Sequence, residues 1–427
     1  MNIDIEFTIR YNNAMHIHFV GIGGIGMSAL ARLYQARGVE VSGSDVTDSP
    51  ILDALRDEGM GVFVGHSAFQ VAGDVSTVVY SEAIAADNVE LSEARERGIP
   101  LKTYFEALGE VTEEFKTIAV AGSHGKTTTT ALIARLLMRA YRDPTVVIGT
   151  NMKELEGRNM RLGGGEWMVV EACEYRRSFL HLSPKIVVLT NVDLDHLDYY
   201  KDEDDYVRAF EEFVAKLPGD GVLVANGDDE KVRRVAEKAR CDVVYFDRGS
   251  ANLEKLTLAV PGHHNKMNAL GAFMVGMELG IEEELMLEAL NSFEGTWRRF
   301  EYKGKFNGAD VYDDYAHHPA EIQATLQGAR EKYPDHKLIA VFQPHQYSRT
   351  RHFFQEFAKA FGLADEVIVP NIYKVRDSEE AVASVSVERL VNEIKKHHAA
   401  VSGGMGLDGT VEELRGRVGE GELVLVM

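Results

Sequence analysis

The sequence lacks four features that define broad classes of protein. Its 427 residues include only two cysteines, Cys173 and Cys241, which cannot form a disulfide framework. No apolar run approaches the roughly 20 residues of a membrane span, and the opening residues lack the pattern of a signal peptide. An excess of basic residues is also missing, since the formal net charge is −21. We therefore expect a protein of the reducing cytoplasm that binds neither membrane nor nucleic acid.

The rest of the composition is that of a globular protein, with 45% hydrophobic and 26% charged residues. Short apolar strands alternate with helical stretches along the chain, which predicts an α/β protein with parallel, doubly wound sheets. The length suits about two to four domains. We predict three, with boundaries at residues 1–108, 109–294 and 295–427.

A glycine loop follows the first apolar strand, in "HIHFVGIGGIGMSALARLY" from His16. Gly21, Gly23 and Gly26 form the G-x-G-x-x-G pattern between a strand and a helix, where backbone amides bind a pyrophosphate. Asp45 lies about 20 residues further on, where a dinucleotide-binding fold has the acid that binds ribose. This loop alone leaves an NAD-dependent oxidoreductase open as one function.

A second glycine loop, "AGSHGKTTTT", follows the apolar strand that ends at Ala121. It is a shortened Walker A pattern, with two residues between Gly122 and Gly125 where the full pattern has four. Amides and a helix N-terminus can bind phosphates there, Lys126 can neutralise the outer phosphates, and the Thr127 hydroxyl can bind Mg²⁺. The alternative is a glycine turn beside a surface lysine.

Polar side chains follow the next two predicted strands of this block. Glu171 ends one strand, and the residues after the other are Asn191, Asp193, Asp195, His196 and Asp198. Such an oxygen-rich group favours Mg²⁺ over zinc, although the same residues also suit a solvated loop. Cys173 lies among acids, which should raise the pKa of its thiol, so we interpret it as structural and not as a nucleophile.

The ordered set of motifs resembles the Mur ligases of peptidoglycan synthesis over nearly the whole chain. The resemblance rests on "GIGGIGMSALARL", "GSD", "AGSHGKTTTT", "EACEYRRSFL", "TNVDLDHLDYY", "PGHHNKMNA", "FEGTWRRF", "DDYAHHPAE" and "FQPHQYSRTR". It implies a Rossmann-like UDP-binding domain, a central P-loop ATPase-like domain with a parallel sheet, and a C-terminal Rossmann-like α/β domain. It also implies ATP and Mg²⁺ as cofactors, and UDP-N-acetylmuramate and L-alanine as substrates.

The resemblance assigns roles to residues of all three domains. Those implied to bind the UDP-sugar are Gly21, Gly23, Gly24, Gly26, Asp45, His66 and Ser81. Those implied to bind ATP are Gly122, Ser123, His124, Gly125, Lys126, Thr127, Thr128, His264, Asn265, Asn268, Arg299 and Asp314. Those implied to be catalytic are Lys126, Glu171, His196, Arg299 and Asp314, with Thr127, Glu171 and His196 as metal ligands. Those implied to face the carboxylate and the amino acid are His317, His318 and Arg349.

Other functions stay open at this point. A murein tripeptide ligase of cell-wall recycling shares most of these motifs, and a nucleotide-binding regulator without ligase activity is a further alternative. The sequence also departs from the family pattern in places. His263 and Gln346 stand where arginine is common, and the segment between "ANGDD" and "VPGHHN" is short.

Overall fold

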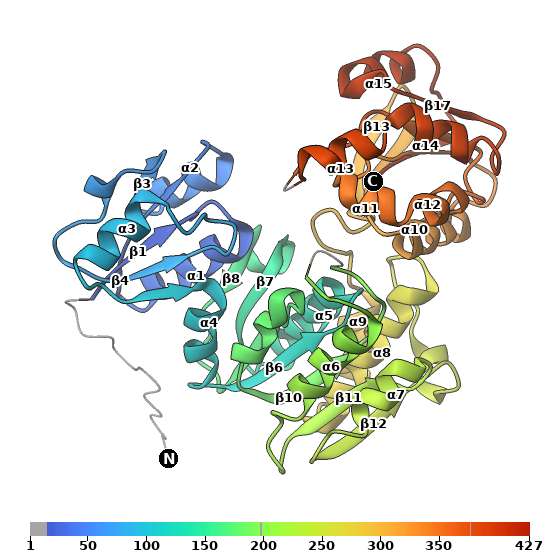
Figure 1. The fold of residues 1–427 in the computed structure, drawn as a ribbon. Coiled ribbons are helices and arrows are strands. Elements are labelled where there is room, and N and C mark those ends of the chain that lie inside the picture. The colour runs from blue at the N-terminus through green and yellow to red at the C-terminus, as the bar shows by residue number, and fades with distance from the viewer. Residues whose placement is uncertain (1–14, 197–198, 376) are drawn as a thin grey trace. The chain divides into compact units, whose positions relative to one another are not determined.

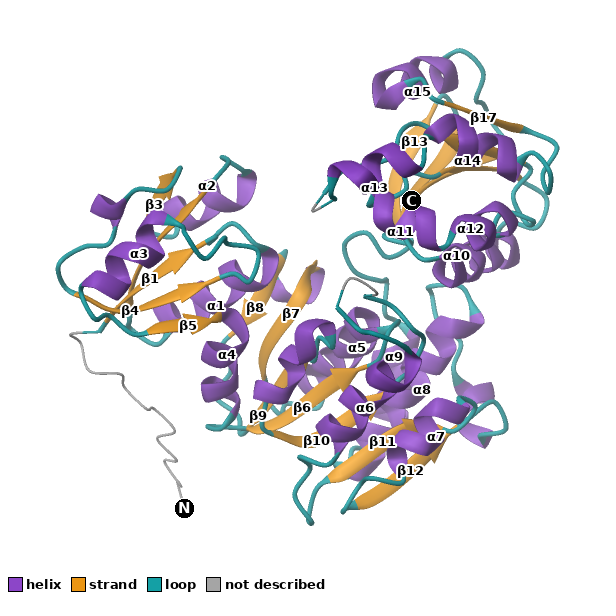
Figure 2. Cartoon of the chain, viewed as in Figure 1, coloured by secondary structure: helices purple, strands orange, loops and turns teal. Residues whose placement is uncertain are grey.

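A computed structural model describes residues 15–196, 199–375 and 377–427 (Figure 1). The chain divides into two compact units, which we describe separately. One runs to Leu256 and includes Asn268–Leu290, and the other holds Thr257–Met267 and Asn291–Met427. Three separate sheets form the framework, and Figure 2 shows their strands surrounded by helices.

The first sheet has five parallel strands in the order β3-β2-β1-β4-β5. Its strands are β1 (His16–Val20), β2 (Glu40–Asp45), β3 (Gly61–Val64), β4 (Val75–Tyr80) and β5 (Leu101–Thr103). Its helices are α1 (Ile25–Ala36), α2 (Pro50–Asp57), η1 (Ala68–Gln70), α3 (Val89–Glu96) and α4 (Tyr104–Thr112). The strand order changes direction at β1, so the carboxyl ends of β1, β2 and β4 flank a ligand-binding position.

The second sheet has seven strands in the order β12-β11-β10-β6-β9-β7-β8, all parallel except β8. Its strands are β6 (Lys116–Ala121), β7 (Thr145–Met152), β8 (Arg158–Arg161), β9 (Trp167–Glu171), β10 (Pro184–Leu189), β11 (Val222–Asn226) and β12 (Asp242–Phe246). The central strand β6 lies between β10 and β9, and its residues from Thr117 to Ala121 are all buried. Burial on both faces explains its continuous apolar sequence.

Helices surround the second sheet, and all of them lie in the same unit except residues 263–267 of α8 and the last residue of α9. They are α5 (Lys126–Arg139), η2 (Lys153–Leu155), η3 (Tyr175–His181), α6 (Glu203–Val214), α7 (Glu230–Ala236), η4 (Ala251–Lys255), α8 (His263–Glu278) and α9 (Glu283–Asn291). The boundary between the two units falls inside α8. Helix α1 of the first sheet packs against β7 and β8, so the first two sheets share one apolar core.

The third sheet has six strands in the order β13-β14-β18-β15-β16-β17. Its strands are β13 (Glu301–Phe306), β14 (Ala309–Asp313), β15 (Lys337–Val341), β16 (Glu366–Val369), β17 (Val401–Gly403) and β18 (Glu422–Val426), and only β13 is antiparallel to its neighbour. Its helices are α10 (Pro319–Lys332), α11 (Tyr347–His352), α12 (Phe354–Lys359), α13 (Glu379–Ser384), α14 (Val387–Ile394) and α15 (Gly406–Arg415).

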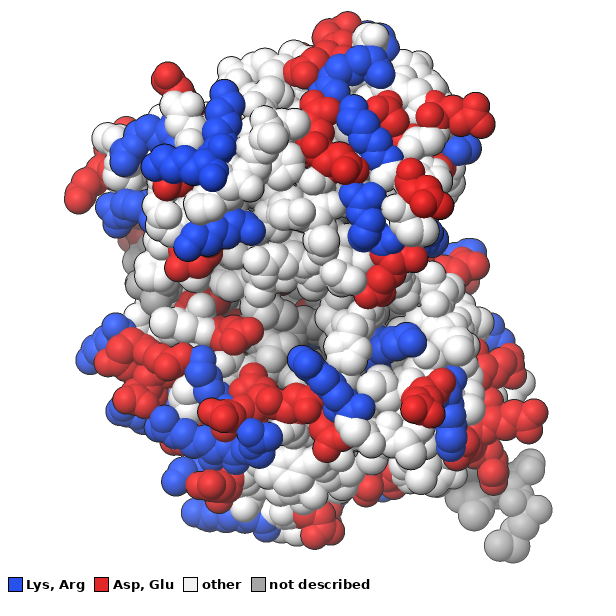
Figure 3. Space-filling model, turned by 90° about the vertical axis from the view of Figure 1, so that its right-hand side faces the viewer, with Lys and Arg blue, Asp and Glu red and all other residues white. Residues whose placement is uncertain are grey.

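The expected α/β class with parallel, doubly wound sheets is confirmed. One sheet lies in each of the three predicted segments, while the boundaries themselves stay predictions. None of the helices in the described part of the chain has the length and apolarity that a membrane crossing needs. Basic and acidic side chains are interspersed over the face drawn in Figure 3.

Candidate functional site

The first glycine loop turns from β1 into α1 at the carboxyl edge of the first sheet. Gly21 has a left-handed φ of 86°, and its amide donates to the Ser44 carbonyl at 2.8 Å. The Gly23 amide donates to Oδ2 of Asp45 at 2.9 Å. Gly24 is exposed at the start of α1 and makes no side-chain cap. The N-terminus of α1 therefore offers amides and a positive dipole end to an anion.

The remaining residues predicted for this pocket are arranged around the loop. A Cβ placed on Gly26 would lie 2.9 Å from Cζ of Tyr104, so only glycine lets α1 approach α4 there. Ser81 follows β4 and lies beside Gly21. Nδ1 of His66 forms a hydrogen bond with Ser44 Oγ at 2.9 Å, and Nε2 of the same ring is enclosed. The structure thus brings the predicted UDP-sugar residues to one edge of the sheet.

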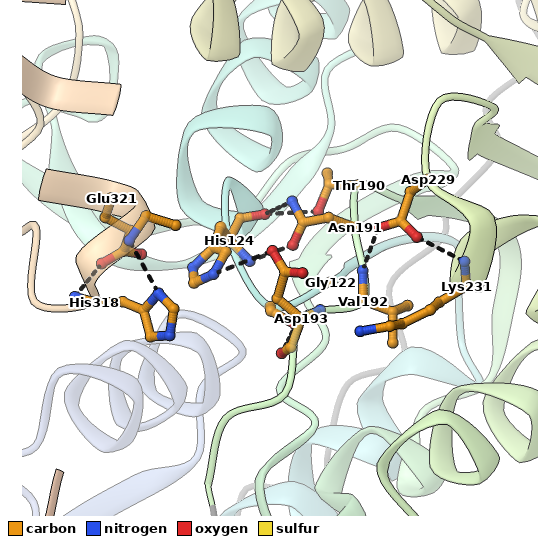
Figure 4. Close-up of polar contacts among 12 residues, drawn as sticks. Gly122, His124, Thr190, Asn191, Val192, Asp193, Asp229, Lys231, His318 and Glu321 are labelled. Atoms are coloured by element: carbon orange, nitrogen blue, oxygen red, sulfur yellow. Dashed lines mark hydrogen bonds and ion pairs between the residues drawn. The ribbon is translucent and has the colours of Figure 1, made fainter. Parts of the chain in front are cut away.

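The second glycine loop is held in place by residues after β10 (Figure 4). Asn191 accepts from the His124 amide at 2.8 Å and donates to the His124 carbonyl at 3.0 Å. The Thr190 hydroxyl donates to the same carbonyl at 2.7 Å. Ser123 Oγ donates to the Asp193 carbonyl at 2.6 Å. These contacts fix the loop backbone before any ligand binds, which is the preorganisation that phosphate binding needs.

Glycine is required where this loop meets α5. Gly125 has a φ of 81° and forms the N-cap of α5 without a side-chain bond. A Cβ on Gly125 would collide with the side-chain amide of Asn268, which lies in the same unit. Lys126, Thr127 and Thr128 then form the first turn of α5. Their backbone amides are the uncapped donors of a helix N-terminus.

Lys126 is paired with an acid that the sequence analysis did not select. Its Nζ lies 2.9 Å from Oε2 of Glu174 and donates to the Ser123 carbonyl at 3.0 Å. Burial lowers the pKa of Lys126, but Glu174 together with the smaller contributions of Cys173 and Glu171 raises it by more, so the ammonium is the stable form. Burial likewise raises the pKa of Glu174, and Lys126 followed by His196 lowers it by more. Glu174 therefore fixes the position of the lysine charge.

Thr127 and Glu171 form an oxygen-donor pair beside the loop. The Thr127 hydroxyl donates to Oε2 of Glu171 at 3.0 Å, and Oε1 accepts from the Gly149 amide at 2.7 Å. A hydroxyl and a carboxylate at this distance are the donor set that a hard cation such as Mg²⁺ prefers. The observed pair therefore fits the predicted metal.

His196 is placed differently from the other two residues predicted as metal ligands. Its Nε2 lies 3.5 Å from Oε1 of Glu174, and its ring packs on Tyr175 with centroids 4.7 Å apart. It has a left-handed φ of 54°. The contacts of His196 thus join it to the Lys126–Glu174 pair. Asp198, the last acid of the same motif, lies outside the described residues.

The predicted adenine-side residues lie at the start of α8. Asn265 donates to the Pro261 carbonyl at 2.6 Å, and Asn268 faces Gly125. Burial lowers the pKa of His264 to about 4, so its ring is neutral at physiological pH. The neutral ring of His264 and the side-chain amide of Asn265, which belong to the same unit, are groups suited to hydrogen bonding with an uncharged base.

Asp314 is a buried acid in the second unit. It accepts from the Phe300 amide at 2.7 Å, the Ala316 amide at 2.8 Å and the Thr325 hydroxyl at 3.2 Å. Burial raises its pKa to about 6, while Arg299 acts to lower it. The guanidinium of Arg299 lies 5.5 Å from the centroid of the Tyr315 ring.

A cavity of about 290 Å³ lies in the same unit. Its lining comprises Arg298, Tyr315, Ala316, His317, Gln343, His345, Tyr373 and Met427. His317 was predicted to face the substrate and does line this cavity, whereas the lining includes neither His318 nor Arg349. His318 instead caps α10, where its Nδ1 accepts from the Ala320 amide at 3.3 Å, and Arg349 lies on α11.

The cavity contains an arginine that the sequence analysis passed over. Arg298 lies 3.4 Å from Oδ2 of Asp313 and stacks on Tyr315 at 4.9 Å from the ring centroid. The only sequence signal was its place beside Arg299 in "WRRF". A stacked guanidinium is a suitable partner for a small carboxylate because its orientation is already fixed.

The structural interpretation of Cys173 leads to a chemical prediction. Burial, followed by the charge of Glu174, raises the pKa of its thiol to about 12, in the direction that the sequence analysis predicted. Because only the thiolate is alkylated, we expect iodoacetamide at pH 8 to modify Cys173 about 1000-fold more slowly in the folded chain than in the unfolded chain. Peptide mass spectrometry at intervals measures both rates. Equal rates would contradict a thiol that stays protonated in the folded chain.

Family comparisons cover the chain in three consecutive parts. Residues 16–116 match the Mur ligase family, catalytic domain. Residues 120–276 match the Mur ligase middle domain, and residues 298–427 match the Mur ligase, glutamate ligase domain.

Individual relatives are similar over most of their length. The UDP-N-acetylmuramate–L-alanine ligase of Clostridium botulinum is 40% identical, with 89% of this chain and 88% of the relative covered. The enzyme of the same name from Lachnospira eligens is 41% identical, with 91% and 90% covered. The crystal structure of UDP-N-acetylmuramate–alanine ligase from Thermotoga maritima has a TM-score of 0.81 at 30% identity, covering 96% of this chain and 95% of that one.

Proposed function

The chain belongs to the Mur ligase family, and from this premise we propose that it joins L-alanine to the lactyl carboxylate of UDP-N-acetylmuramate in an ATP-dependent reaction of peptidoglycan precursor synthesis. The observation that carries the proposal is the preorganised phosphate loop with its fixed lysine, on a chain about 40% identical to such ligases. The oxidoreductase alternative explained only the first glycine loop. That loop serves here to bind the pyrophosphate of a UDP-sugar, since its amides recognise pyrophosphate whatever base is attached.

The reaction proceeds in two balanced steps. A lactyl carboxylate oxygen attacks the γ-phosphorus of ATP, the bond to the β,γ-bridging oxygen breaks, and ADP leaves. The amine of L-alanine then attacks the acyl phosphate carbonyl, loses a proton, and phosphate leaves as the amide forms. Activation comes first because a free carboxylate is a poor acyl donor.

The residues contribute mainly charge and position. Two anions must meet in the first step, and the Lys126 ammonium offsets both their repulsion and the charge that develops on the transferred group. Arg299 is proposed to add a second positive charge, and Asp314 to hold the backbone around it through the Phe300 amide. His317 and Arg298 are proposed to orient the amino acid in the cavity.

Thr127 and Glu171 are proposed to hold Mg²⁺, with His196 contributing through Glu174. When bound, the ion supplies charge neutralisation at the triphosphate. Lys126, the loop amides and the helix N-terminus orient the phosphates.

A charge-removing variant tests this metal assignment. We expect Glu171→Gln to raise the Mg²⁺ concentration for half-maximal activity by at least about tenfold, as is usual when a partner of a metal site is lost. Mn²⁺ binding followed by electron paramagnetic resonance gives a readout independent of turnover. Glu166→Gln, an exposed acid just before β9, serves as the control. An unchanged Mn²⁺ affinity in Glu171→Gln would contradict the assignment.

Phosphate release from ATP and Mg²⁺ tests the function itself. The assay contains UDP-N-acetylmuramate and compares L-alanine, glycine, L-serine and the murein tripeptide as amine donors. We expect turnover that depends on the sugar and is strongest with L-alanine. Turnover with the tripeptide alone would place the chain in the recycling branch. Binding of both nucleotides without turnover would favour the regulator.

A further inference from the structure

A buried hydrogen-bond chain lies under the glycine loop of the first sheet. Its members are Glu90 of α3, His18 of β1, and Ser42 and Ser44 of β2, none of which was among the predicted site residues. Glu90, His18 and Ser44 are each 0% exposed. A buried carboxylate needs hydrogen-bond donors around it. The donors that surround Glu90 identify the segments of the chain that it holds in place.

Glu90 is surrounded by hydrogen-bond donors. Its Oε2 accepts from Ser44 Oγ at 2.6 Å and from Nε2 of His18 at 3.3 Å, and its Oε1 accepts from the Ser67 amide at 3.0 Å. Burial raises the pKa of Glu90, but these hydrogen bonds lower it by more. Its place in the first turn of α3 adds the favourable end of the helix dipole. Glu90 is therefore ionised.

Two of these partners belong to the backbone that forms the UDP-sugar site. The Ser44 carbonyl accepts from the amides of Gly21 at 2.8 Å and Ile22 at 3.0 Å, which are the first two amides of the glycine loop. The Ser67 amide lies in the segment that follows β3, and the Gly65 amide of that segment donates to the Asp45 carbonyl at 2.7 Å. One carboxylate thus connects the end of β2 with the 65–67 segment.

The position of the Ser44 hydroxyl proton shows that His66 also belongs to this hydrogen-bond chain. The single Ser44 hydroxyl proton is donated to Glu90, so Nδ1 of His66 must donate to Ser44 Oγ at 2.9 Å. Nε2 of His66 is enclosed and has no hydrogen-bond partner within the described part of the chain. His66 therefore fastens its segment to β2 as a hydrogen-bond donor through Nδ1.

We propose that Glu90 is a positioning residue of the UDP-sugar site. Through Ser44 and Ser67, its carboxylate holds the end of β2 and the 65–67 segment in the arrangement that directs the glycine-loop amides at the pyrophosphate. The inference rests on the proposed function of this loop. A small displacement of preoriented amides weakens anion binding, because each amide contributes only over a short range of distances.

Ser42 and Ser44 provide a matched pair of test sites on the same strand. Ser42 Oγ lies 2.7 Å from Nε2 of His16 and 2.8 Å from Nδ1 of His18, so it belongs to the same buried network. Only Ser44 is directly connected to the glycine loop. Truncating either hydroxyl disturbs the network, whereas only the Ser44 change releases the loop backbone from Glu90.

The experiment compares four variants by steady-state kinetics and by calorimetric binding of UDP-N-acetylmuramate. We expect Glu90→Gln and Ser44→Ala to raise both KM and Kd for the sugar about tenfold or more, while KM for ATP stays within about twofold of wild type. Ser42→Ala and the exposed Glu96→Gln of α3 should leave the KM for the sugar unchanged. In Ser44→Ala the ¹⁵N shifts of His66 should also lose the signature of the hydrogen-bonded Nδ1 proton.

Other outcomes would contradict either the positioning role of Glu90 or the proposed function itself. If Ser42→Ala raises the sugar KM as much as Ser44→Ala does, the network is only structural and the inference is wrong. The same holds if Glu90→Gln lowers the unfolding temperature but leaves KM unchanged. Should Glu90→Gln fail to fold, the serine pair decides the question. A wild-type chain that does not bind UDP-N-acetylmuramate would instead contradict the proposed function.

Discussion

Replacing Lys126 by alanine is expected to lower ATP-dependent phosphate release by about 1000-fold or more, the upper range for loss of one preorganised electrostatic group. The physical reason is that Lys126 supplies a fixed positive charge where the carboxylate and the γ-phosphate must approach each other. The structure predicts a second effect, because Glu174 is only 1% exposed and Lys126 is its nearest cation. Removing the lysine leaves that carboxylate buried, so the free energy of unfolding should fall by about 3 kcal/mol.

A second substitution separates these two effects. In Lys126→Ala combined with Glu174→Gln, the buried charge is gone, so most of the lost unfolding free energy should return while activity does not. Urea unfolding and a coupled phosphate assay measure the two quantities on the same samples. Activity within about tenfold of wild type in Lys126→Ala would refute the catalytic role. Recovery of activity in the double variant would show that instability alone caused the loss.

Arg298→Ala is expected to raise the KM for L-alanine by about 30-fold or more, with little change in the KM for ATP. The expected size follows from losing a charge-assisted hydrogen bond to the bound carboxylate, which costs about 1.5–3 kcal/mol. Arg298 lines the cavity of the second unit and is held by Tyr315 and Asp313, so it meets a carboxylate without first being ordered. Steady-state kinetics with L-alanine varied at saturating sugar and ATP gives the value.

Two further variants test whether the planar guanidinium of Arg298, and not positive charge in general, causes this change in KM. Arg298→Lys keeps the charge but loses the planar fork, so its KM should lie between those of wild type and Arg298→Ala. Arg351→Ala, an exposed arginine of α11, should have no effect. If Arg298→Ala changed kcat alone, the arginine would act on the reaction and not on amino-acid binding.

Both glycine loops could be predicted from the sequence because their chemistry is local. A strand, a run of glycines and a helix are consecutive in the chain, so the backbone amides that bind phosphate are placed by neighbouring residues. The same holds for Thr127 at the start of α5 and Glu171 at the end of β9, since parallel strands bring their carboxyl ends to one edge. The predicted strands before both loops are confirmed as β1 and β6.

The amino-acid cavity was only partly predicted. His317 was anticipated in it, whereas Arg298 was passed over in favour of its neighbour Arg299, and Arg349 is not among the lining residues. Adjacent arginines carry the same chemical signal, and the turn through Arg298, which has a φ of 56°, decides which guanidinium lines the cavity.

By itself, the sequence determined the α/β class, the two anion-binding loops and the family, because each depends on residues close together in the chain or on the order of whole motifs. The tertiary structure alone revealed Glu174 and Glu90 as the buried acids behind those loops. Glu90 lies in "NVELSEARERG" among surface acids that look the same, and Glu174 follows Glu171 off the end of a strand. Whether a carboxylate is buried, and which donors surround it, depends on segments far away in the sequence. The pairing of β1 with β2 and the packing of α3 beside them determine that environment for Glu90.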